Sequence, residues 1–190
     1  MSKSKAILSL CALTFLAHTS KSSDTLETTA AMFRGDPAHT GVYSTVGKAR
    51  VQKERWRFRT GNVNRSTPVV IGGAVYVGSQ TGILYALEAA SGSLKWEFPT
   101  PSGIASSPAV AEGMVYINSD SGFFAVDAAS GRQAWQIKTG EPVAFDHRWD
   151  YFQSSPVYAD GTVYFGSADG SCKQVVLHQS GFDVKLGRVK

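Results

Sequence analysis

The chain has 190 residues, of which 43% are hydrophobic and 18% charged, and it carries a formal net charge of +4. This composition excludes a disordered, collagen-like or disulfide-scaffold protein and predicts a packed core. Residues 1–23 and residues 172–190 each carry +3, which leaves −2 for residues 24–171. The basic charge therefore belongs to the two ends and does not indicate a nucleic-acid partner.

Residues 1–23 are predicted to be an export signal. Lys3 and Lys5 precede twelve uncharged residues, from Ala6 to Ala17. An apolar run of this length suits a signal peptide, whereas a membrane-spanning helix needs about 20 apolar residues. The alternative is a buried amino-terminal helix. The sequence thus predicts an exported protein, periplasmic or extracellular, with no transmembrane segment in the mature chain.

An internal repeat follows a leader that occupies residues 24–53. Ser66-Thr67-Pro68 returns as Ser-Ser-Pro at residues 106 and 154, so the spacings are 40 and 48. The strand-like stretches VYVGS, VYINS and VYFGS begin at residues 75, 115 and 163, with the same two spacings. A repeat of this period predicts one structural unit that stacks on its neighbours.

Each period has the pattern of four short strands separated by glycine turns. In the first period the strands are expected at residues 68–71, 74–79, 83–89 and 94–100. Four antiparallel strands in about 40 residues make one blade of a β-propeller. Full blades are predicted at about 66–100 and 106–139, with an incomplete blade at 154–171 and a lone fourth strand from Glu54 to Gly61 ahead of them.

A second motif, Ala-x-acid-x-x-Ser-Gly-x-x-x-Trp, ends each full period. The acid can accept backbone N–H bonds in a turn, and glycine permits the chain reversal. The tryptophan can pack against the neighbouring blade while its indole N–H reaches a backbone acceptor. The predicted docking residues are Trp56, Ala86, Glu88, Gly92, Trp96, Ala125, Asp127, Gly131 and Trp135.

This motif is similar to the tryptophan-docking motif of the pyrroloquinoline quinone (PQQ) type propeller repeat. Over about residues 32–171 the chain resembles the PQQ-like β-propeller family of the quinoprotein alcohol dehydrogenase-like superfamily. The stretch Phe33–Gly41 also looks like the leader of such exported propellers. The resemblance implies an all-β partial β-propeller of four-stranded antiparallel blades, with one lone strand, two full blades and half a blade. Because rings of this family have seven or eight blades, the sequence predicts a truncated propeller.

The tail at residues 172–190 lacks the docking motif and is predicted to lie outside the repeat. It also contains Cys172, the single cysteine left after removal of the signal. A frameshift after Ser171 would explain the unmatched sequence. The alternative is that the tail folds as two ordinary strands, Lys173–Leu177 and Asp183–Val189.

One loop is the candidate binding site. The longer spacing between the second and third periods comes from an insertion at Glu141–Gln153. Loops between blades open onto a propeller face, where ligands commonly bind. The alternative is that the aromatic residues pack over a blade and the charges stay in solvent. The candidate residues are Asp146, His147, Arg148, Trp149 and Asp150; no catalytic or metal-binding residue is predicted.

The resemblance implies two functions of different kinds. The first is a non-catalytic binding or scaffold module, similar to the outer-membrane assembly propellers, whose partner is another protein or the missing blades of the same propeller. The second is the amino-terminal part of a PQQ-dependent quinoprotein dehydrogenase for alcohols or sugars, with PQQ and calcium as cofactors. Members with that activity have adjacent cysteines, which this chain lacks. The sequence therefore favours the scaffold and does not firmly imply a cofactor; an unstable remnant without function is the third possibility.

Overall fold

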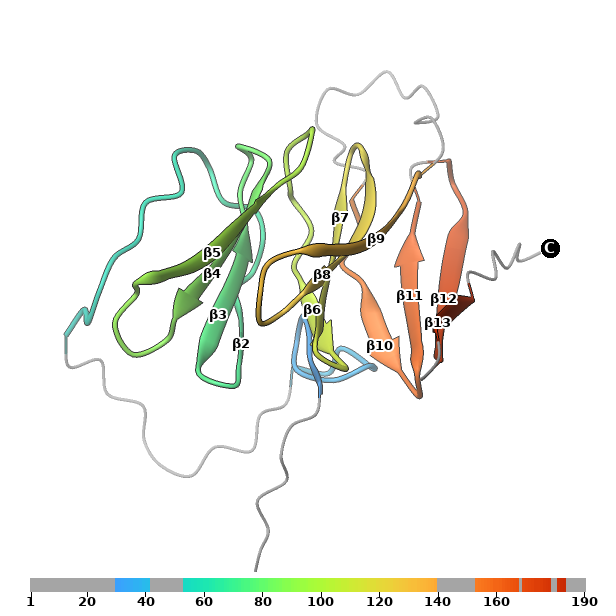
Figure 1. Cartoon of the computed structure of the whole chain (residues 1–190), viewed down its shortest axis with the longest axis horizontal. Coiled ribbons are helices and arrows are strands. Elements are labelled where there is room, and N and C mark those ends of the chain that lie inside the picture. Colours follow the sequence, from blue (N-terminus) through green and yellow to red (C-terminus); the bar gives the residue numbers. More distant parts are fainter. Residues whose placement is uncertain (1–29, 42–52, 140–152, 168, 179–180, 184–190) are drawn as a thin grey trace, which may run out of the picture.

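Three antiparallel sheets stand side by side in chain order (Figure 1). The computed structural model describes residues 30–41, 53–139, 153–167, 169–178 and 181–183, and all regular elements in these ranges are strands. No helix in the described ranges has the length and apolar character needed to cross a bilayer. The predicted signal at 1–23 lies outside the described residues. The all-β partial propeller of four-stranded blades is confirmed.

Strand order follows chain order within each blade. The first blade consists of β2 (Val69–Ile71), β3 (Ala74–Gly78), β4 (Ile83–Glu88) and β5 (Leu94–Pro99). The second blade consists of β6 (Ala109–Ala111), β7 (Met114–Ser119), β8 (Gly122–Asp127) and β9 (Gln133–Ile137). The third blade consists of β10 (Val157–Ala159), β11 (Thr162–Gly166), β12 (Cys172–His178) and β13 (Gly181–Asp183). We call the side of each blade formed by its first strand the inner edge.

The first hairpin of every blade uses the same two-residue turn. Both turn residues have positive φ, at 56° and 73° for Gly72-Gly73, 51° and 71° for Glu112-Gly113, and 47° and 72° for Asp160-Gly161. Two consecutive positive φ angles define the type I′ turn, whose twist matches that of the flanking strands. The turn therefore fixes the same register in all three blades.

The core lies between the blades. In β7, Val115 and Ile117 pack with Phe124 against the first blade, while Tyr116 and Phe123 pack against the third blade. The side chains of these five residues are at most 2% exposed. Burial on both faces explains why the central strands are nearly continuous apolar runs rather than alternating polar and apolar residues.

The third blade corrects the prediction of a half blade. Strand β12 pairs with β11, with Val175 opposite Val163, and β13 pairs with β12. Backbone groups make the ladder, so the lost docking motif does not prevent pairing. Val175 is fully buried and keeps the core-facing position. The alternative strand Lys173–Leu177 lies inside β12, whereas Asp183–Val189 lies outside the described residues except for Asp183.

The lone fourth strand predicted from Glu54 to Gly61 is not observed. Residues 53–61 have no strand assignment. Trp56 and Phe58 nevertheless pack against a buried cluster on the outward face of the first blade, which contains Val75 and Leu87. The segment thus covers this face with side chains rather than extending a sheet.

The leader adds a strand that the sequence did not predict. Strand β1 (Ala30–Ala31) pairs antiparallel with β6 at the inner edge of the second blade, with Ala31 opposite Val110. Met32 follows and is buried between the second and third blades. Farther along, Asp36 accepts hydrogen bonds from Thr40, and these bonds hold the pKa of Asp36 below its usual value.

Candidate functional site

Trp96 docks the first blade onto the second. Its Nε1 donates to the carbonyl oxygen of Ala128 at 3.0 Å. Its ring lies over Gly131, where an added Cβ would come within 2.7 Å of the indole. A register shift in the β4–β5 ladder, just before Trp96, sets the direction of the ring. Gly131 has φ +72°, so both the backbone conformation and the close contact require glycine.

Trp56 makes the same contact with the first blade. Its Nε1 donates to the carbonyl oxygen of Ala89 at 2.9 Å, and its ring lies over Gly92, which has φ +73°. Segment 53–61 is therefore attached to the first blade in the way that the first blade is attached to the second. The structure gives Trp56 and Trp96 one role, which is to join consecutive units.

The acidic motif position acts differently in the two blades. Asp127 accepts hydrogen bonds from the backbone N–H of Ser130 at 2.7 Å and from its hydroxyl at 2.5 Å. The Ser130 bonds hold the pKa of Asp127 below its usual value. In the first blade, Glu88 lies 3.6 Å from the ammonium of Lys95. Both acids stabilise their turns, by a cap in one blade and by an ion pair in the other.

The motif alanines lie opposite the tryptophans. Ala86 pairs with Trp96 across β4–β5, and Ala125 pairs with Trp135 across β8–β9. Both alanines are fully buried. A small side chain at this point leaves room for the neighbouring blade to approach.

The Ser-Ser/Thr-Pro repeats carry a hydrogen-bond ladder that sequence reasoning missed. The first serine joins strands within a blade: Ser106 Oγ accepts from the N–H of Asn118 at 3.0 Å and donates to its carbonyl at 2.7 Å. The second joins blades: the N–H of Thr67 donates to Ser107 Oγ at 2.9 Å, and the N–H of Ser107 donates to Ser155 Oγ at 3.0 Å. The sequence signal that could have revealed this ladder is the recurrence of two neighbouring hydroxyl residues before each proline of the repeat.

The boundary between the second and third blades lacks part of the docking motif. Trp135 packs against Tyr116 and Phe123, with ring centroids 5.9 Å apart in both pairs. In β12, Gln174 and Val176 replace the motif alanine and acid, since Gln174 lies opposite Tyr164 as Ala125 lies opposite Tyr116 in β7. The second boundary therefore differs from the first boundary in its hydrogen bonds and in its buried polar atoms.

A tyrosine pair shows this difference directly. The hydroxyl of Tyr76 donates to the carbonyl oxygen of Ala128 at 3.3 Å. Tyr116 occupies the same position one blade later and is fully buried, but no described residue accepts its hydroxyl. Burial raises the pKa of Tyr116 well above its usual value.

The candidate loop residues Asp146, His147, Arg148, Trp149 and Asp150 lie outside the described residues. Gln153, at the end of the insertion, is described and clamps the third blade to the second. Its Oε1 accepts from the N–H groups of Ala105 and Ser106, and its Nε2 donates to the Gly103 carbonyl at 2.9 Å and to Asp120 Oδ1 at 2.8 Å. No sequence pattern identified this residue.

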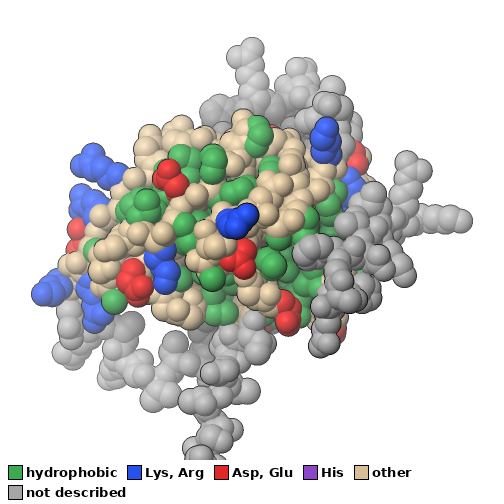
Figure 2. Space-filling view, in the orientation of Figure 1, with side chains coloured by type: hydrophobic (Ala, Val, Ile, Leu, Met, Phe, Trp, Pro, Cys, Tyr) green, Lys and Arg blue, Asp and Glu red, His purple; other side chains and the backbone are tan. Residues whose placement is uncertain are grey.

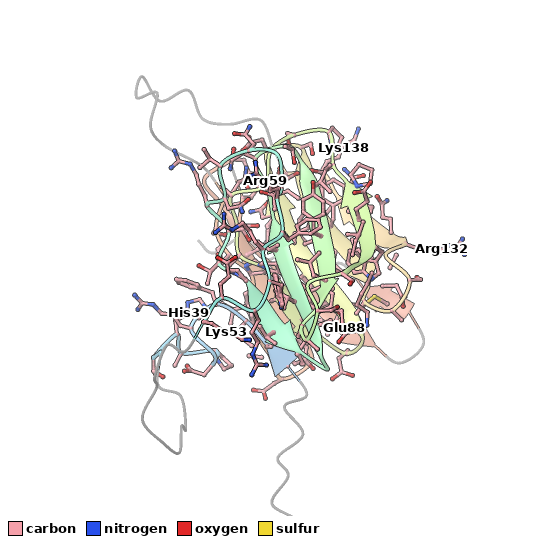
Figure 3. The ribbon with its side chains drawn as sticks, turned by 90° about the vertical axis from the view of Figure 1, so that its left-hand side faces the viewer. His39, Lys53, Arg59, Glu88, Arg132 and Lys138 are labelled. Atoms are coloured by element: carbon pink, nitrogen blue, oxygen red, sulfur yellow. The ribbon has the colours of Figure 1, made fainter. Side chains whose placement is uncertain are left out.

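A basic stripe runs along residues 53–65. Lys and Arg side chains gather at the left-hand edge of the space-filling view (Figure 2), and Figure 3 shows Lys53 and Arg59 at the two ends of the extended part of this segment. Arg57 pairs with Glu54 at 2.9 Å. Basic residues are therefore concentrated in this segment, although the net charge of residues 24–171 is slightly negative. The exposed basic residues are Lys53, Arg55, Arg57, Arg59 and Arg65.

The family described as outer membrane protein assembly factor BamB matches residues 45–188. The chain belongs to this family of PQQ-like β-propeller repeat proteins. The match includes the tail at residues 172–188, in agreement with its pairing in the third blade. No curated protein matches the chain.

Solved PQQ-like propellers show the same fold. BamB from Moraxella catarrhalis superposes with a TM-score of 0.51 and 22% identity, over 63% of this chain and 35% of that chain. A europium-containing methanol dehydrogenase superposes with a TM-score of 0.51 and 18% identity, over 67% of this chain and 25% of that chain. At these identities the likeness concerns the fold alone. The aligned part of this chain corresponds to about a third or less of either protein.

Calcium, which the resemblance pairs with PQQ, would need several oxygen ligands close together. Within the ranges described, no three His, Cys, Asp or Glu side chains come together as metal ligands. Asp120 accepts the bond from Gln153, and Asp169 pairs with Lys173 Nζ at 2.8 Å. The ammonium of Lys173 and the hydroxyl of Ser171 hold the pKa of Asp169 well below its usual value. These two carboxylates therefore bond to other side chains of the repeat.

Proposed function

We propose that the chain is an exported, non-catalytic PQQ-like propeller module that binds another protein or further blades of the same propeller. One observation carries the proposal: the polar and aromatic groups of the repeat are used to join blades. Trp96 bonds to Ala128, and Thr67 and Ser107 bond to the next inner strand. Open blade faces and strand edges are then the surfaces offered to a partner. Export rests on the predicted signal at residues 1–23.

The outer face of the third blade is one such surface. Tyr164 is 39% exposed, whereas Tyr76 and Tyr116, at the same position in the other blades, are 5% and 0% exposed. In both of those blades the next blade covers the tyrosine. The family description, outer membrane protein assembly factor, supports a protein partner.

The candidate loop belongs to the same proposal. Asp146, His147, Arg148, Trp149 and Asp150 are proposed to contribute to a binding face between the second and third blades. Replacing His147 and Trp149 together is expected to weaken partner binding. Unchanged binding by a folded double variant would remove the loop from the proposal.

The test combines cofactor uptake with site-specific crosslinking. Purified chain is incubated with PQQ and calcium and passed through a sizing column, and the scaffold proposal expects folded protein without quinone absorbance. A photo-crosslinking residue at position 164 is expected to give a discrete adduct in cells, unlike the same residue at exposed position 91. One PQQ co-eluting per chain would instead support the second candidate, the amino-terminal part of a PQQ-dependent dehydrogenase.

A further inference from the structure

The leader shows that an inner edge of this propeller can take an added strand. Ala31 of β1 pairs with Val110 of β6 in antiparallel register. Val110 lies opposite Val115 in its own blade, one position beyond the pair Ala111 and Met114 that flanks the type I′ turn. In a two-residue hairpin the flanking pair is hydrogen-bonded, so the next residue directs its N–H and C=O away from its hairpin partner. These groups face β1.

The first blade has the same edge without such a strand. Val70 lies opposite Val75, one position beyond the turn-flanking pair Ile71 and Ala74, as Val110 does in the second blade. Strand β2 is the edge of its sheet, so the N–H and C=O of Val70 point to an edge that no described strand pairs with. By the same alternation, Ala30 of β1 directs its backbone groups away from β6.

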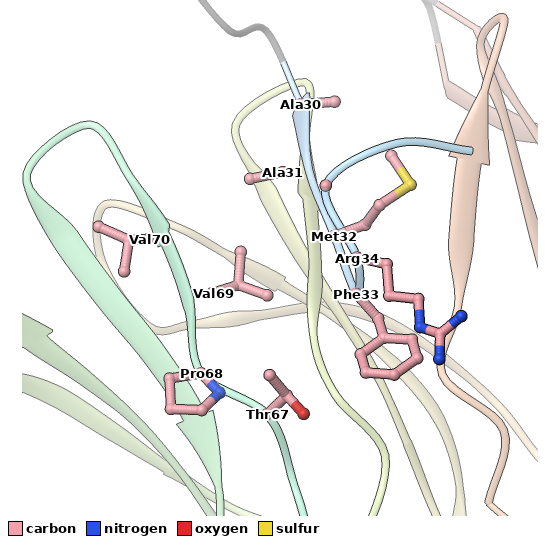
Figure 4. Close-up of a pocket in the computed structure, with 10 residues that line it drawn as sticks. Ala30, Ala31, Met32, Phe33, Arg34, Thr67, Pro68, Val69 and Val70 are labelled. Atoms are coloured by element: carbon pink, nitrogen blue, oxygen red, sulfur yellow. The ribbon is translucent and has the colours of Figure 1, made fainter. Parts of the chain in front are cut away.

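A groove of about 400 Å³ lies between these two edges (Figure 4). The leader and residues 67–70 line it, with Ala31 and Val69 on facing sides in the close-up. Arg34 is among the residues that line the groove; its Nη1 donates to the His39 carbonyl at 3.5 Å, and its guanidinium carbon lies 5.6 Å from the centroid of the Phe33 ring. No described carboxylate pairs with Arg34, so the lining of the groove includes one positively charged side chain.

We propose that this inner-edge groove binds an extended peptide of a partner protein, with small apolar side chains and a carboxylate beside Arg34. The peptide would add to β2 through Val70, as the leader adds to β6 through Val110. The leader of a second copy fits less well, because residues 30–34 contain no acid. This inference rests on the proposed scaffold function and assigns its partner and site.

The test uses the purified full chain and the peptide Thr-Val-Ala-Val-Ala-Asp, labelled with fluorescein at its amino terminus. Fluorescence anisotropy is expected to show saturable binding. Val70→Pro removes the N–H that points to the free edge without touching the ladder to β3, and it should weaken binding by about tenfold or more. Val70→Thr keeps the N–H and should bind within about twofold of the original chain. Arg34→Gln, or a peptide ending in Lys, should weaken binding by about fivefold.

Circular dichroism and thermal melting confirm that each variant is folded. Absence of peptide binding by the folded original chain overturns the inference, as does equal binding by Val70→Pro or by a backbone N-methylated peptide. Concentration-dependent dimerisation that Val70→Pro abolishes would also overturn it, in favour of a second copy as occupant. A third result would separate this inference from the proposed function. If position 164 still crosslinks to a partner in the Val70→Pro variant but no peptide binds, the scaffold function is supported and only the groove is excluded as a binding site.

Discussion

The two blade boundaries of this chain are built from the same repeat but keep different parts of it. At the first boundary, Trp96 and Tyr76 both donate to the carbonyl oxygen of Ala128. At the second boundary the inner contacts persist: Ser107 donates to Ser155 Oγ, and Asn118 Nδ2 donates to the Gly166 carbonyl at 2.9 Å. In the outer part, Gln174 and Val176 of β12 stand where the second blade has the motif residues Ala125 and Asp127.

The repeat joins consecutive blades by two sets of contacts, which we call the inner device and the outer device. The inner device consists of hydrogen bonds that join the Ser-Ser/Thr-Pro segments of consecutive blades and, at the second boundary, the second strands β7 and β11. These bonds do not involve the docking motif. The outer device needs an alanine, an acid and a glycine at fixed positions in the next blade. At the second boundary, where the motif alanine and acid are replaced, the rings of Phe123 and Phe165 stack with centroids 3.8 Å apart. A blade can therefore pack in this fold without these two motif residues.

The largest expected effect comes from breaking the outer device. Gly131→Ala places a Cβ 2.7 Å from the Trp96 ring and forces alanine into φ +72°, so we expect a loss of about 3 kcal/mol in the free energy of unfolding. Gly113→Ala is the matched control, because it has φ +71° and open space around the Cβ; its expected loss is about 1 kcal/mol. Urea unfolding measures both. Equal losses would show that the Trp96 contact contributes nothing.

Removing the clamp at the second boundary should have a smaller effect. Gln153→Ala leaves the N–H groups of Ala105 and Ser106 without this acceptor, and we expect a loss of about 2 kcal/mol. Gln133→Ala on the exposed side of β9 is the control and should change stability by less than about 0.5 kcal/mol. Similar values for the two variants would mean that Gln153 does not join the blades.

The tyrosine pair sharpens the comparison further. Tyr76→Phe removes the bond to the Ala128 carbonyl and should cost about 1 kcal/mol. Tyr116→Phe removes a buried hydroxyl that no described residue bonds, so stability should be unchanged or rise by about 1 kcal/mol. Thermal melting of the two single variants decides this. A clear loss for Tyr116→Phe would show that its hydroxyl has a partner.

The smallest expected effect concerns pH. The folded-state pKa of Asp127 is lowered by Ser130, below an unfolded value of about 3.9. Its contribution is therefore fully present above that unfolded value and is lost as the pH falls through the folded pKa. Asp127→Asn should flatten the dependence of stability on pH in the acidic range below about pH 4. An unchanged profile would contradict the turn-capping role of this carboxylate.

Much of the fold was predictable because local chemistry repeats. The turn glycines and the VYxGS stretches placed the strands of the first blade within about one residue of their observed ends. The sequence did not decide whether the residues of β12 form a strand of the third blade. Backbone pairing needs no motif, so the missing motif did not exclude a strand, and only Val175 preserved the apolar pattern. The leader strand was missed because Ala30 and Ala31 carry no strand signal. Gln153 was missed because its role depends on the turn of another blade.

Hydrogen–deuterium exchange, resolved by peptide, tests the central claim that the complete docking motif of the second blade makes the first boundary more stable than the second boundary. Amides of β3, β4, β7 and β8, which form the first boundary, should exchange most slowly, and those of β12 should exchange at least about tenfold faster. Gly131→Ala should remove much of the difference by opening the outer joint of the first boundary. Equal protection of β8 and β12 in the original chain would contradict the account.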